Sequence, residues 1–232
     1  MIVLSLGGSL IVPKNIDVEF LARFRKVLLK NRKRYRFVVV CGGGSTARNY
    51  IKGLEGMKGM KGVGDRKKVY FQSLLGISST RMNARFMTYF FGKDANRGIP
   101  HDMQSVKDSL RRNDIVFCGA LRYAMNQTSD STAVKLARFL GCDFVNLTNV
   151  KGLYEKNPKK FRKAGFIPEI SSKDFLKKAR AIEFHPGQHF VLDQTAAKIV
   201  DKYGVKSFIL GEDMENLDRF LNGKHYVGTV IG

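Results

Sequence analysis

The chain has 232 residues, 44% of them hydrophobic, with 41 lysines and arginines against 20 aspartates and glutamates, a formal net charge of +21. This length and composition suit one large α/β domain, or two closely fused lobes, with a buried core. No run approaches the roughly 20 apolar residues of a membrane span, and Met1 leads directly into a strand-like run, unlike a secretory signal. We therefore expect a cytoplasmic protein with no membrane partner.

The basic residues form short clusters spread along the chain rather than one tract. No aromatic-studded RNA-recognition signature or helix-turn-helix pattern accompanies them. A generally basic surface, or one that serves phosphorylated ligands, therefore explains the charge better than dedicated nucleic-acid recognition. A charge of +21 nevertheless attracts any polyanion, so nucleic-acid binding stays open. The clusters are Arg32-Lys33-Arg34, Arg66-Lys67-Lys68, 156–163 and Lys177-Lys178.

The three cysteines, Cys41, Cys118 and Cys142, are odd in number and lack CxxC spacing. Each lies at or beside a strand-like run, which favours buried free thiols over disulfides or metal ligands. The four histidines also lack the spacing of a zinc site. We expect no structural metal.

Two apolar runs near the start of the chain end in glycine and pass into a helix-like pattern. Ile2–Leu6 leads into Gly7-Gly8-Ser9, and Phe37–Cys41 leads into Gly42-Gly43-Gly44-Ser45. Glycines let main-chain N–H groups converge on an anion, and the following helix adds unpaired donors and the positive end of its dipole. One such turn can simply connect a strand to a helix, whereas two within 50 residues favour a phosphate site.

Between the two turns, Asp17 is predicted to cap a helix through Lys33, because its apolar residues fall on one stripe. A short helix follows from Ser45, and segment 53–64 contains so much glycine that we expect a flexible loop able to act as a lid. A long helix from about Val69 to Phe91 and a shorter one then precede a strand at 114–118.

The second half of the chain continues the alternation of strands and helices. Ser129 or Asp130 is expected to cap a helix through Leu140 that Gly141 ends, before a strand at 143–147. Asp193 opens another helix, closed by Gly204, and strands at 205–210 and 226–231 follow. This order predicts an α/β fold whose mainly parallel sheet has helices on both faces and binds ligands at the carboxyl ends of its strands.

Several motifs recur in an order and spacing that is more specific than any one of them. They are Gly7-Gly8-Ser9 with Val12-Pro13 and Asp17, Gly42 to Arg48, Leu75-Gly76-Ile77 with Thr80 to Ala84, Thr148-Asn149-Val150 with Gly152 and Tyr154, Pro158-Lys159-Lys160, and Asp193 with Ala196 to Ile199. Together they resemble the amino acid kinase superfamily and, within it, the uridylate (UMP) kinases of the archaeal type.

This resemblance implies a three-layer αβα sandwich with a mainly parallel central sheet, built as one amino acid kinase-like domain over 1–232. Its acceptor-binding part would span about 1–125 and its nucleotide-binding part about 126–232. Such kinases assemble as homo-oligomers, here a dimer or a hexamer. The implied reaction is phosphoryl transfer from ATP to UMP with Mg²⁺, in which the protein mainly aligns charged groups and neutralises the charge between them.

The resemblance also implies roles for individual residues. The positions that match contacts to the ATP phosphates are Gly8, Ser9, Gly44 and Arg48. Those that match the adenine and ribose pocket are Thr148, Tyr154 and Asn157. Those on the acceptor side are Gly43, Ser73, Arg122 and Thr128.

Three residues are candidates for the reaction centre. Asp130 and Asp193 match carboxylates that organise the centre or Mg²⁺, although both stand where a helix begins and can simply cap it. Lys198, five residues beyond Asp193, points either to the same end of the sheet or into solvent.

The departures from the family pattern cluster on the acceptor side. Ser73 stands where an Asp usually holds the acceptor, and the loop 119–127 is longer and lacks the usual Pro-Gly turn, leaving Arg122 as a possible phosphate contact. Lys151 replaces an Asp near the nucleotide, and Ser5 replaces a lysine that many members carry before the first Gly-Gly.

Three functions therefore remain open. The first is a UMP kinase, and the second is a kinase of the same fold for another small acceptor such as isopentenyl phosphate. The third is a catalytically silent member that binds nucleotides or nucleic acid.

Overall fold

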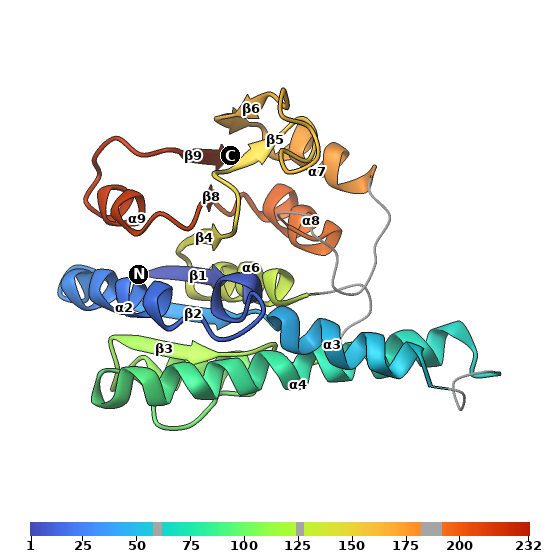
Figure 1. The fold of residues 1–232 in the computed structure, drawn as a ribbon. Helices are drawn as coiled ribbons and strands as arrows, with labels where there is room; N and C mark the ends of the chain where they lie inside the picture. Colours follow the sequence, from blue (N-terminus) through green and yellow to red (C-terminus); the bar gives the residue numbers. More distant parts are fainter. Residues whose placement is uncertain (58–61, 124–127, 182–191) are drawn as a thin grey trace.

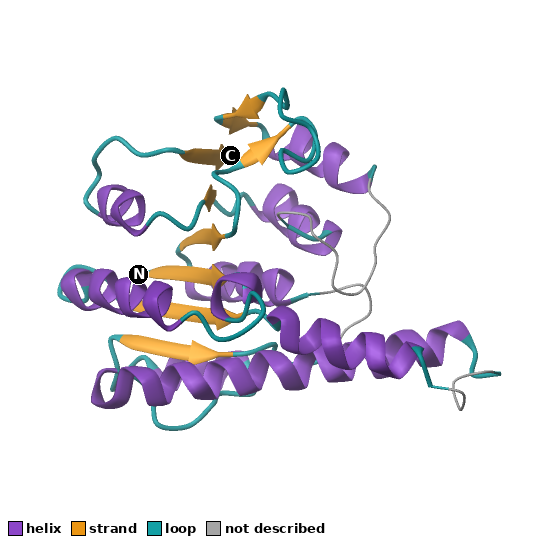
Figure 2. Ribbon diagram, in the orientation of Figure 1, coloured by secondary structure: helices purple, strands orange, loops and turns teal. Residues whose placement is uncertain are grey.

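The computed structural model describes residues 1–57, 62–123, 128–181 and 192–232, and these form a seven-stranded sheet with helices on both faces (Figures 1 and 2). The strand order is β3-β2-β1-β4-β8-β9-β7. The first five strands run parallel, whereas β9 is antiparallel to β8 and parallel to β7, so the predicted mainly parallel sheet is confirmed. The strands are β1 (Ile2–Leu6), β2 (Phe37–Cys41), β3 (Ile115–Cys118), β4 (Asp143–Leu147), β7 (Glu169–Ile170), β8 (Ser207–Leu210) and β9 (Gly228–Ile231).

The side chains of each strand alternate between two buried cores. Leu4 of β1 packs with Phe24 in the core under α2 (Val18–Asn31), α4 (Asp65–Phe91) and α9 (Met214–Leu221). Val3 packs in the second core, under α5 (Met103–Ser109), α6 (Ser129–Leu140), α7 (Ser172–Arg180) and α8 (Gln194–Tyr203). Because both faces are covered, the central strands read as continuous apolar runs, as parallel sheets do.

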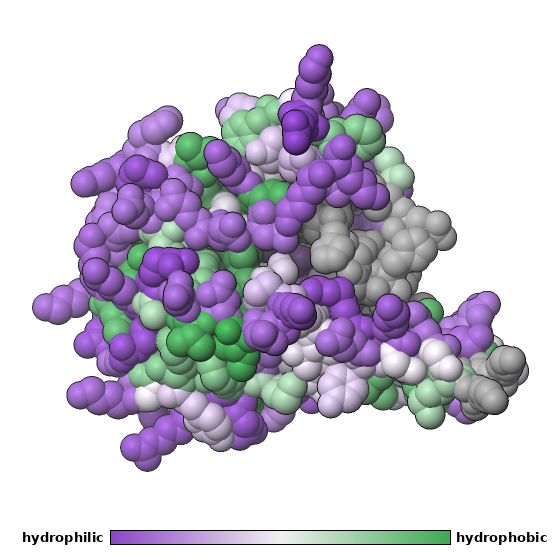
Figure 3. Space-filling model, viewed as in Figure 1, coloured by the Kyte–Doolittle hydropathy of each residue, from purple (hydrophilic) through white to green (hydrophobic). Residues whose placement is uncertain are grey.

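The remaining elements lie at the edges of these layers. Two short helices, α1 (Gly8–Ile11) and α3 (Gly44–Glu55), follow β1 and β2, and the 3₁₀ turn η2 (Gly92–Asp94) follows α4. Strands β5 (Leu153–Tyr154) and β6 (Phe166–Ile167) form a separate antiparallel hairpin, and hydrophilic and hydrophobic residues are mixed on the surface at that end of the molecule (Figure 3). None of the helices in the described part of the chain combines the length and the apolarity needed to span a membrane.

Most of the predicted helix ends are confirmed. The Asp17 carboxylate accepts a hydrogen bond from the Phe20 amide at 2.9 Å, and the Asp193 carboxylate accepts one from the Ala196 amide at 2.8 Å. Gly141 and Gly204 end α6 and α8 in the left-handed conformation, with φ of 64° and 61°. All three cysteines are free thiols, Cys41 and Cys118 buried and Cys142 half-buried, as the sequence predicts.

Two predictions about element ends are wrong. Thr128, and not Ser129 or Asp130, caps α6, because the chain is still extended at Thr128 and its hydroxyl accepts from the Asp130 amide. The bounds expected after the second glycine turn are also wrong: the loop expected at 53–64 begins later, since α3 continues to Glu55, and the helix expected from about Val69 already begins at Asp65. Residues 58–61 of that segment lie outside the described residues.

The carboxyl ends of the central strands meet at one edge of the sheet. Leu6 is paired with Cys41, so the turns after β1 and β2 leave the sheet side by side. The Gly42 amide donates to the Leu6 carbonyl, and the Gly7 amide donates to the Leu147 carbonyl, both at 2.9 Å. These hydrogen bonds bring both glycine turns to the edge where ligands bind in such sheets.

The two glycine turns touch through their backbones, with no room for a side chain between them. A Cβ on Gly8 would overlap the Gly44 nitrogen, and a Cβ on Gly44 would overlap the Gly8 carbonyl oxygen and lie 2.9 Å from that of Val12. Gly44 also has φ of 65°, which L-residues other than glycine rarely adopt. Glycine is therefore required here for the fold as well as for any ligand.

Gly44→Ala should destabilise the protein, because the left-handed backbone alone costs about 1–2 kcal/mol and the overlap with Gly8 adds to it. Gly53→Ala is the matched control: Gly53 is exposed on the same helix with open space around it, so alanine should stabilise the helix by up to about 1 kcal/mol. Chemical unfolding of both variants measures the difference. Equal free energies of unfolding would contradict the backbone contact.

Candidate active site

Four main-chain amides at the sheet edge remain available for an anion. Gly43 is right-handed, with φ of −82° and ψ of −27°, and Gly44 is left-handed, an alternation that forms a concave nest of N–H groups. Within the described residues, the amides of Gly8, Ser9, Gly43 and Gly44 have no main-chain or side-chain partner. We refer to these four amides as the glycine nest.

A buried amide side chain on α4 holds the second glycine turn in place. Asn83 Nδ2 donates to the carbonyl oxygens of Gly42, at 2.7 Å, and Gly43, at 3.2 Å. In a trans peptide group the N–H points opposite to the C=O. Because Asn83 binds the carbonyl oxygens of Gly42 and Gly43, the amides of Gly43 and Gly44 point away from Asn83. The sequence analysis assigned Asn83 no role, although a polar residue on an otherwise core-facing helix stripe was a signal for one.

Two further α4 residues hold the segment that follows β3. Thr80 Oγ1 accepts from the Ala120 amide at 2.9 Å, and the Arg81 guanidinium donates to the carbonyl oxygens of Ala120, at 3.1 Å, and Leu121, at 2.6 Å. One helix therefore fixes both the glycine nest and the start of the expected acceptor loop. Of that loop, residues 124–127 lie outside the described part of the chain.

Arg48 lies on α3 one turn after the glycine nest and is half-buried. Its guanidinium has no hydrogen-bond or ion-pair partner among the described residues. A half-buried guanidinium beside unpaired amides suits a phosphate, which guanidinium can bind through two parallel hydrogen bonds.

Asp130 faces the centre of the sheet from the first turn of α6. Ser5, fully buried on β1, donates from its hydroxyl to Asp130 Oδ1 at 2.6 Å. The pKa of Asp130 is raised to about 7: burial is the main cause, the Ser5 hydrogen bond lowers the pKa, and the nearby Asp193 carboxylate raises it. This carboxyl therefore changes charge near neutral pH. A bound cation would favour the charged form and keep the carboxyl ionised.

Asp193 has a different environment, although it is close to Asp130. It is 2% exposed, and its oxygens accept from the amides and hydroxyls of both Thr128 and Ser131 and from the Ala196 amide, over 2.5–3.2 Å. These bonds join the start of α6 to the start of α8. The geometry supports the capping role that the sequence left open, extended here to two helices.

The acceptor-side candidates lie on three separate elements. Ser73 Oγ donates to the Val69 carbonyl of its own helix at 2.7 Å, and the Thr128 hydroxyl donates to Asp193 at 2.6 Å. Arg122 is exposed and lines a cavity beside α5. Tyr123 crosses Tyr70 of α4 edge-to-face at 4.8 Å, a contact between the acceptor segment and α4 that the sequence analysis missed.

The nucleotide-side candidates follow β4 and lie around the β5–β6 hairpin. Thr148 is half-buried, and its amide donates to the Leu210 carbonyl at 3.0 Å. Tyr154 packs against Phe166 with ring centres 5.4 Å apart. Asn157 is exposed and bonds the Lys159 amide at 2.9 Å, closing a local turn.

Lys198 is exposed on α8 and has no partner among the described residues. Of the two orientations that the sequence left open for it, the exposed side chain is the one observed. The structure does not bring it into contact with Asp130 or Asp193.

The model of the family described as "Amino acid kinase family" matches residues 1–211. The chain belongs to the amino acid kinase family. This kinase-family chain is 30% identical to the uridylate kinase of Methanothermobacter thermautotrophicus, covering 99% of this chain and 98% of that protein. It is 32% identical to the uridylate kinase of Methanoculleus marisnigri, covering 99% and 94%.

Solved structures of kinases agree with the family assignment. The crystal structure of the uridylate kinase from Archaeoglobus fulgidus superposes with a TM-score of 0.82 at 29% identity, covering 100% of this chain and 99% of that one. The UMP kinase from Ureaplasma parvum shares the fold, with a TM-score of 0.76 at 17% identity over 100% and 97% of the two chains. The predicted fold class and family are confirmed.

Asp193→Asn should lower the free energy of unfolding by about 1–3 kcal/mol, because an amide leaves several buried donors without an acceptor. Asp17→Asn is the matched control, since Asn caps a helix end as well as Asp. Chemical unfolding compares the two variants. If Asp193→Asn unfolds like Asp17→Asn but loses turnover, the helix clamp is wrong and a role in the reaction is supported.

Asp130→Asn should become more stable than the unmodified chain as pH rises. With a folded-state pKa of about 7 and an ordinary value near 4 when unfolded, Asp130 keeps a proton on folding that the unfolded chain releases, so stability is lost as pH rises through that window. The variant has no such proton. Thermal unfolding with chelator between pH 4.5 and 8.5 should show the gap in Tm widening with pH, by about 2–4 °C per kcal/mol. A gap that is constant or larger at low pH would contradict the shift.

Proposed function

We propose that this chain is a uridylate kinase that transfers the γ-phosphoryl group of ATP to UMP, giving ADP and UDP. The observation that carries the proposal is the glycine nest beside Arg48, in a chain that resembles archaeal uridylate kinases over nearly its whole length. The nest provides hydrogen-bond donors for phosphate oxygens. The choice of UMP as the phosphoryl acceptor rests on the similarity to uridylate kinases.

Phosphoryl transfer requires little covalent chemistry from the protein, because catalysis consists of positioning and of stabilising charge on the transferred group. The amides of the glycine nest are fixed by the contact between the two turns and by Asn83, so they need no rearrangement when charge develops. Arg48 adds a positive charge one helical turn away. We assign the ATP phosphates to this nest, with Gly43 also facing the acceptor phosphate.

The residues at the sheet edge are compatible with Mg²⁺. Protein-bound Mg²⁺ keeps several waters and uses one or two carboxylates together with substrate phosphates. The described residues contain no group of three or more metal-ligating side chains, and the Asp193 oxygens are already occupied. Asp130, whose Oδ2 has no partner among the described residues, would hold the ion together with ATP, and the ion would neutralise phosphate charge.

A second acceptor remains a candidate because of Ser73. Its hydroxyl is used by the Val69 carbonyl, and serine provides no carboxylate to hold a ribose. The same donor site could therefore serve another small phosphorylated acceptor such as isopentenyl phosphate.

We also propose that the chain forms a homo-oligomer, a dimer or a hexamer. Support comes from large side chains left exposed on α3 and α4, namely Tyr50 at 61%, Met82 at 52% and Tyr89 at 68%. Large side chains exposed in this way are available to a partner surface of a second copy. A monomeric mass by light scattering would contradict it.

A coupled assay of ADP release with ATP and Mg²⁺ tests the function across UMP, CMP, dCMP, AMP, GMP and isopentenyl phosphate. We expect turnover with UMP, and Arg48→Ala should lower kcat/KM by about 10-fold or more through loss of a charge-assisted phosphate contact. Lys52→Ala, an exposed cation on the same helix, is the control.

The pattern of turnover separates the alternatives. Turnover with isopentenyl phosphate alone supports the second acceptor, and absence of turnover with any pyrimidine monophosphate refutes the uridylate kinase. Equal effects of the Arg48 and Lys52 changes would refute the phosphate role of Arg48.

A further inference from the structure

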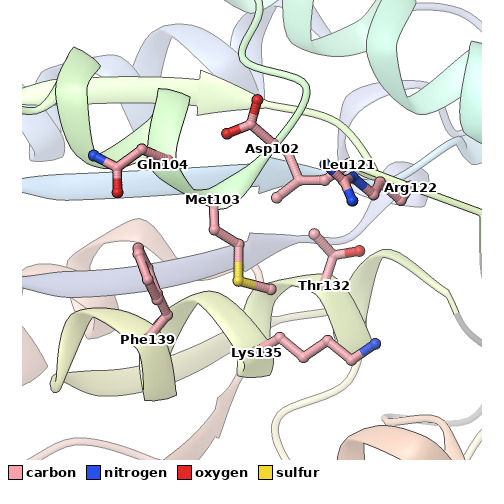
Figure 4. A pocket seen from close by; sticks show the side chains of 8 residues that line it. All are labelled: Asp102, Met103, Gln104, Leu121, Arg122, Thr132, Lys135 and Phe139. Atoms are coloured by element: carbon pink, nitrogen blue, oxygen red, sulfur yellow. The ribbon is translucent and has the colours of Figure 1, made fainter.

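A cavity of about 450 Å³ opens between α5, α6 and the segment that follows β3 (Figure 4). Cavities of 300–1,000 Å³ with apolar walls and a few convergent polar groups are the usual form of small-molecule sites. None of its lining residues belongs to α3, α4 or the glycine turns. It is therefore a second concave site, separate from the nest to which the proposed function assigns ATP.

The two ends of this cavity differ in chemistry. Phe139 lies at one end, Met103 projects into the middle, and Arg122, Thr132 and Lys135 gather at the other end (Figure 4). An aromatic ring and an adaptable thioether suit a flat apolar group. A guanidinium, an ammonium and a hydroxyl suit a phosphate or carboxylate.

Arg122 has the capacity to bind such an anion. The described residues contain no carboxylate within ion-pair distance of its guanidinium. The nearby acid of the lining, Asp102, is occupied by the amide and hydroxyl of Ser105, at 2.8 and 2.7 Å. Asp102 attracts Arg122 electrostatically, but it accepts no hydrogen bond from the guanidinium, whose donors are not used by this carboxylate.

We propose that this cavity binds an aromatic anion of nucleoside monophosphate size, with its ring against Phe139 and Met103 and its phosphate or carboxylate between Arg122 and Lys135. The site is one for reversible binding and involves no chemical step.

Binding at this site reaches the acceptor side through Leu121. Leu121 lines the cavity, and its carbonyl is also held by Arg81 of α4, which anchors the acceptor segment. Arg122, the next residue, belongs to the same segment. An occupant should therefore change the affinity for the acceptor by at least about 5-fold, the lower end of common coupling between two sites. This coupling, unlike the binding itself, rests on the proposed function.

Isothermal titration of the full chain with 1-naphthyl phosphate, 1-naphthoate, AMP and CMP tests the site, with and without saturating UMP and a non-hydrolysable ATP analogue. Inorganic phosphate and 1-naphthylmethanol test the anion and the ring alone. We expect one-to-one binding of at least one aromatic anion that persists when the active site is saturated. Comparison of 1-naphthyl phosphate with 1-naphthoate shows whether the site prefers a phosphate or a carboxylate. Comparison with AMP and CMP shows whether it prefers a nucleotide or a simpler aromatic ring.

Phe139→Asp should weaken that binding by at least 10-fold, because it places a carboxylate at the aromatic end. Phe139 is 44% exposed, so the change should be tolerated by the fold. Val18→Asp places the same carboxylate at an exposed position of α2 and should have no effect. If Phe139→Asp fails to fold, Met103→Trp, which fills the cavity, replaces it.

Three results would overturn the site: no binding by any aromatic anion, binding abolished by saturating UMP and the ATP analogue, or equal binding in the Phe139 and Val18 variants. An unchanged Kd for UMP with the probe bound would overturn the coupling alone. Failure of UMP to bind at all would refute the proposed function and leave the cavity site standing, since its own titration is read without UMP.

Discussion

The structure depends on one close contact, between the main chains of Gly8 and Gly42 to Gly44. Register places Leu6 of β1 opposite Cys41 of β2, so two turns must leave the sheet in the same small space. Only residues without a Cβ fit there, and Gly44 also needs a positive φ. The contact that allows the strands to end together also brings the four unpaired amides of the glycine nest to the same edge of the sheet, so fold and anion site have the same physical origin.

Two carboxylates behind this contact perform different tasks because their surroundings differ. Asp193 accepts hydrogen bonds from both α6 and α8 and has no acceptor capacity to spare, so it clamps the two helices. Asp130 receives one hydrogen bond, from Ser5, and burial raises its pKa to about 7. Neighbouring acids whose environments separate their roles are a common arrangement in active sites. Ser5 offers a buried hydroxyl and no charge, so β1 provides Asp130 with no cation.

Helix α4 links the donor and acceptor sides of the site. Asn83 holds the second glycine turn, while Thr80 and Arg81 hold the segment after β3. The segment after β3, which lines the cavity beside α5, and the glycine nest are therefore held by the same helix. Ser73, on the acceptor side, lies on the same helix and takes no part in these contacts of Thr80, Arg81 and Asn83.

The sequence by itself determined the six longer strands, the glycine turns, most helix caps and the family, because each depends on local pattern or on motifs in a recognisable order; it did not predict the two-residue strands β5, β6 and β7. It located Gly43, Gly44 and Arg48 at the sheet edge for the same reason. Only the tertiary structure decided which polar groups were already used: Ser5 meets Asp130 across 125 positions of the chain, and Thr128 meets Asp193 across 65. Hydrogen bonds between residues so far apart leave no local pattern, so the partners of Asp193 and Asn83 could be read only from the folded chain.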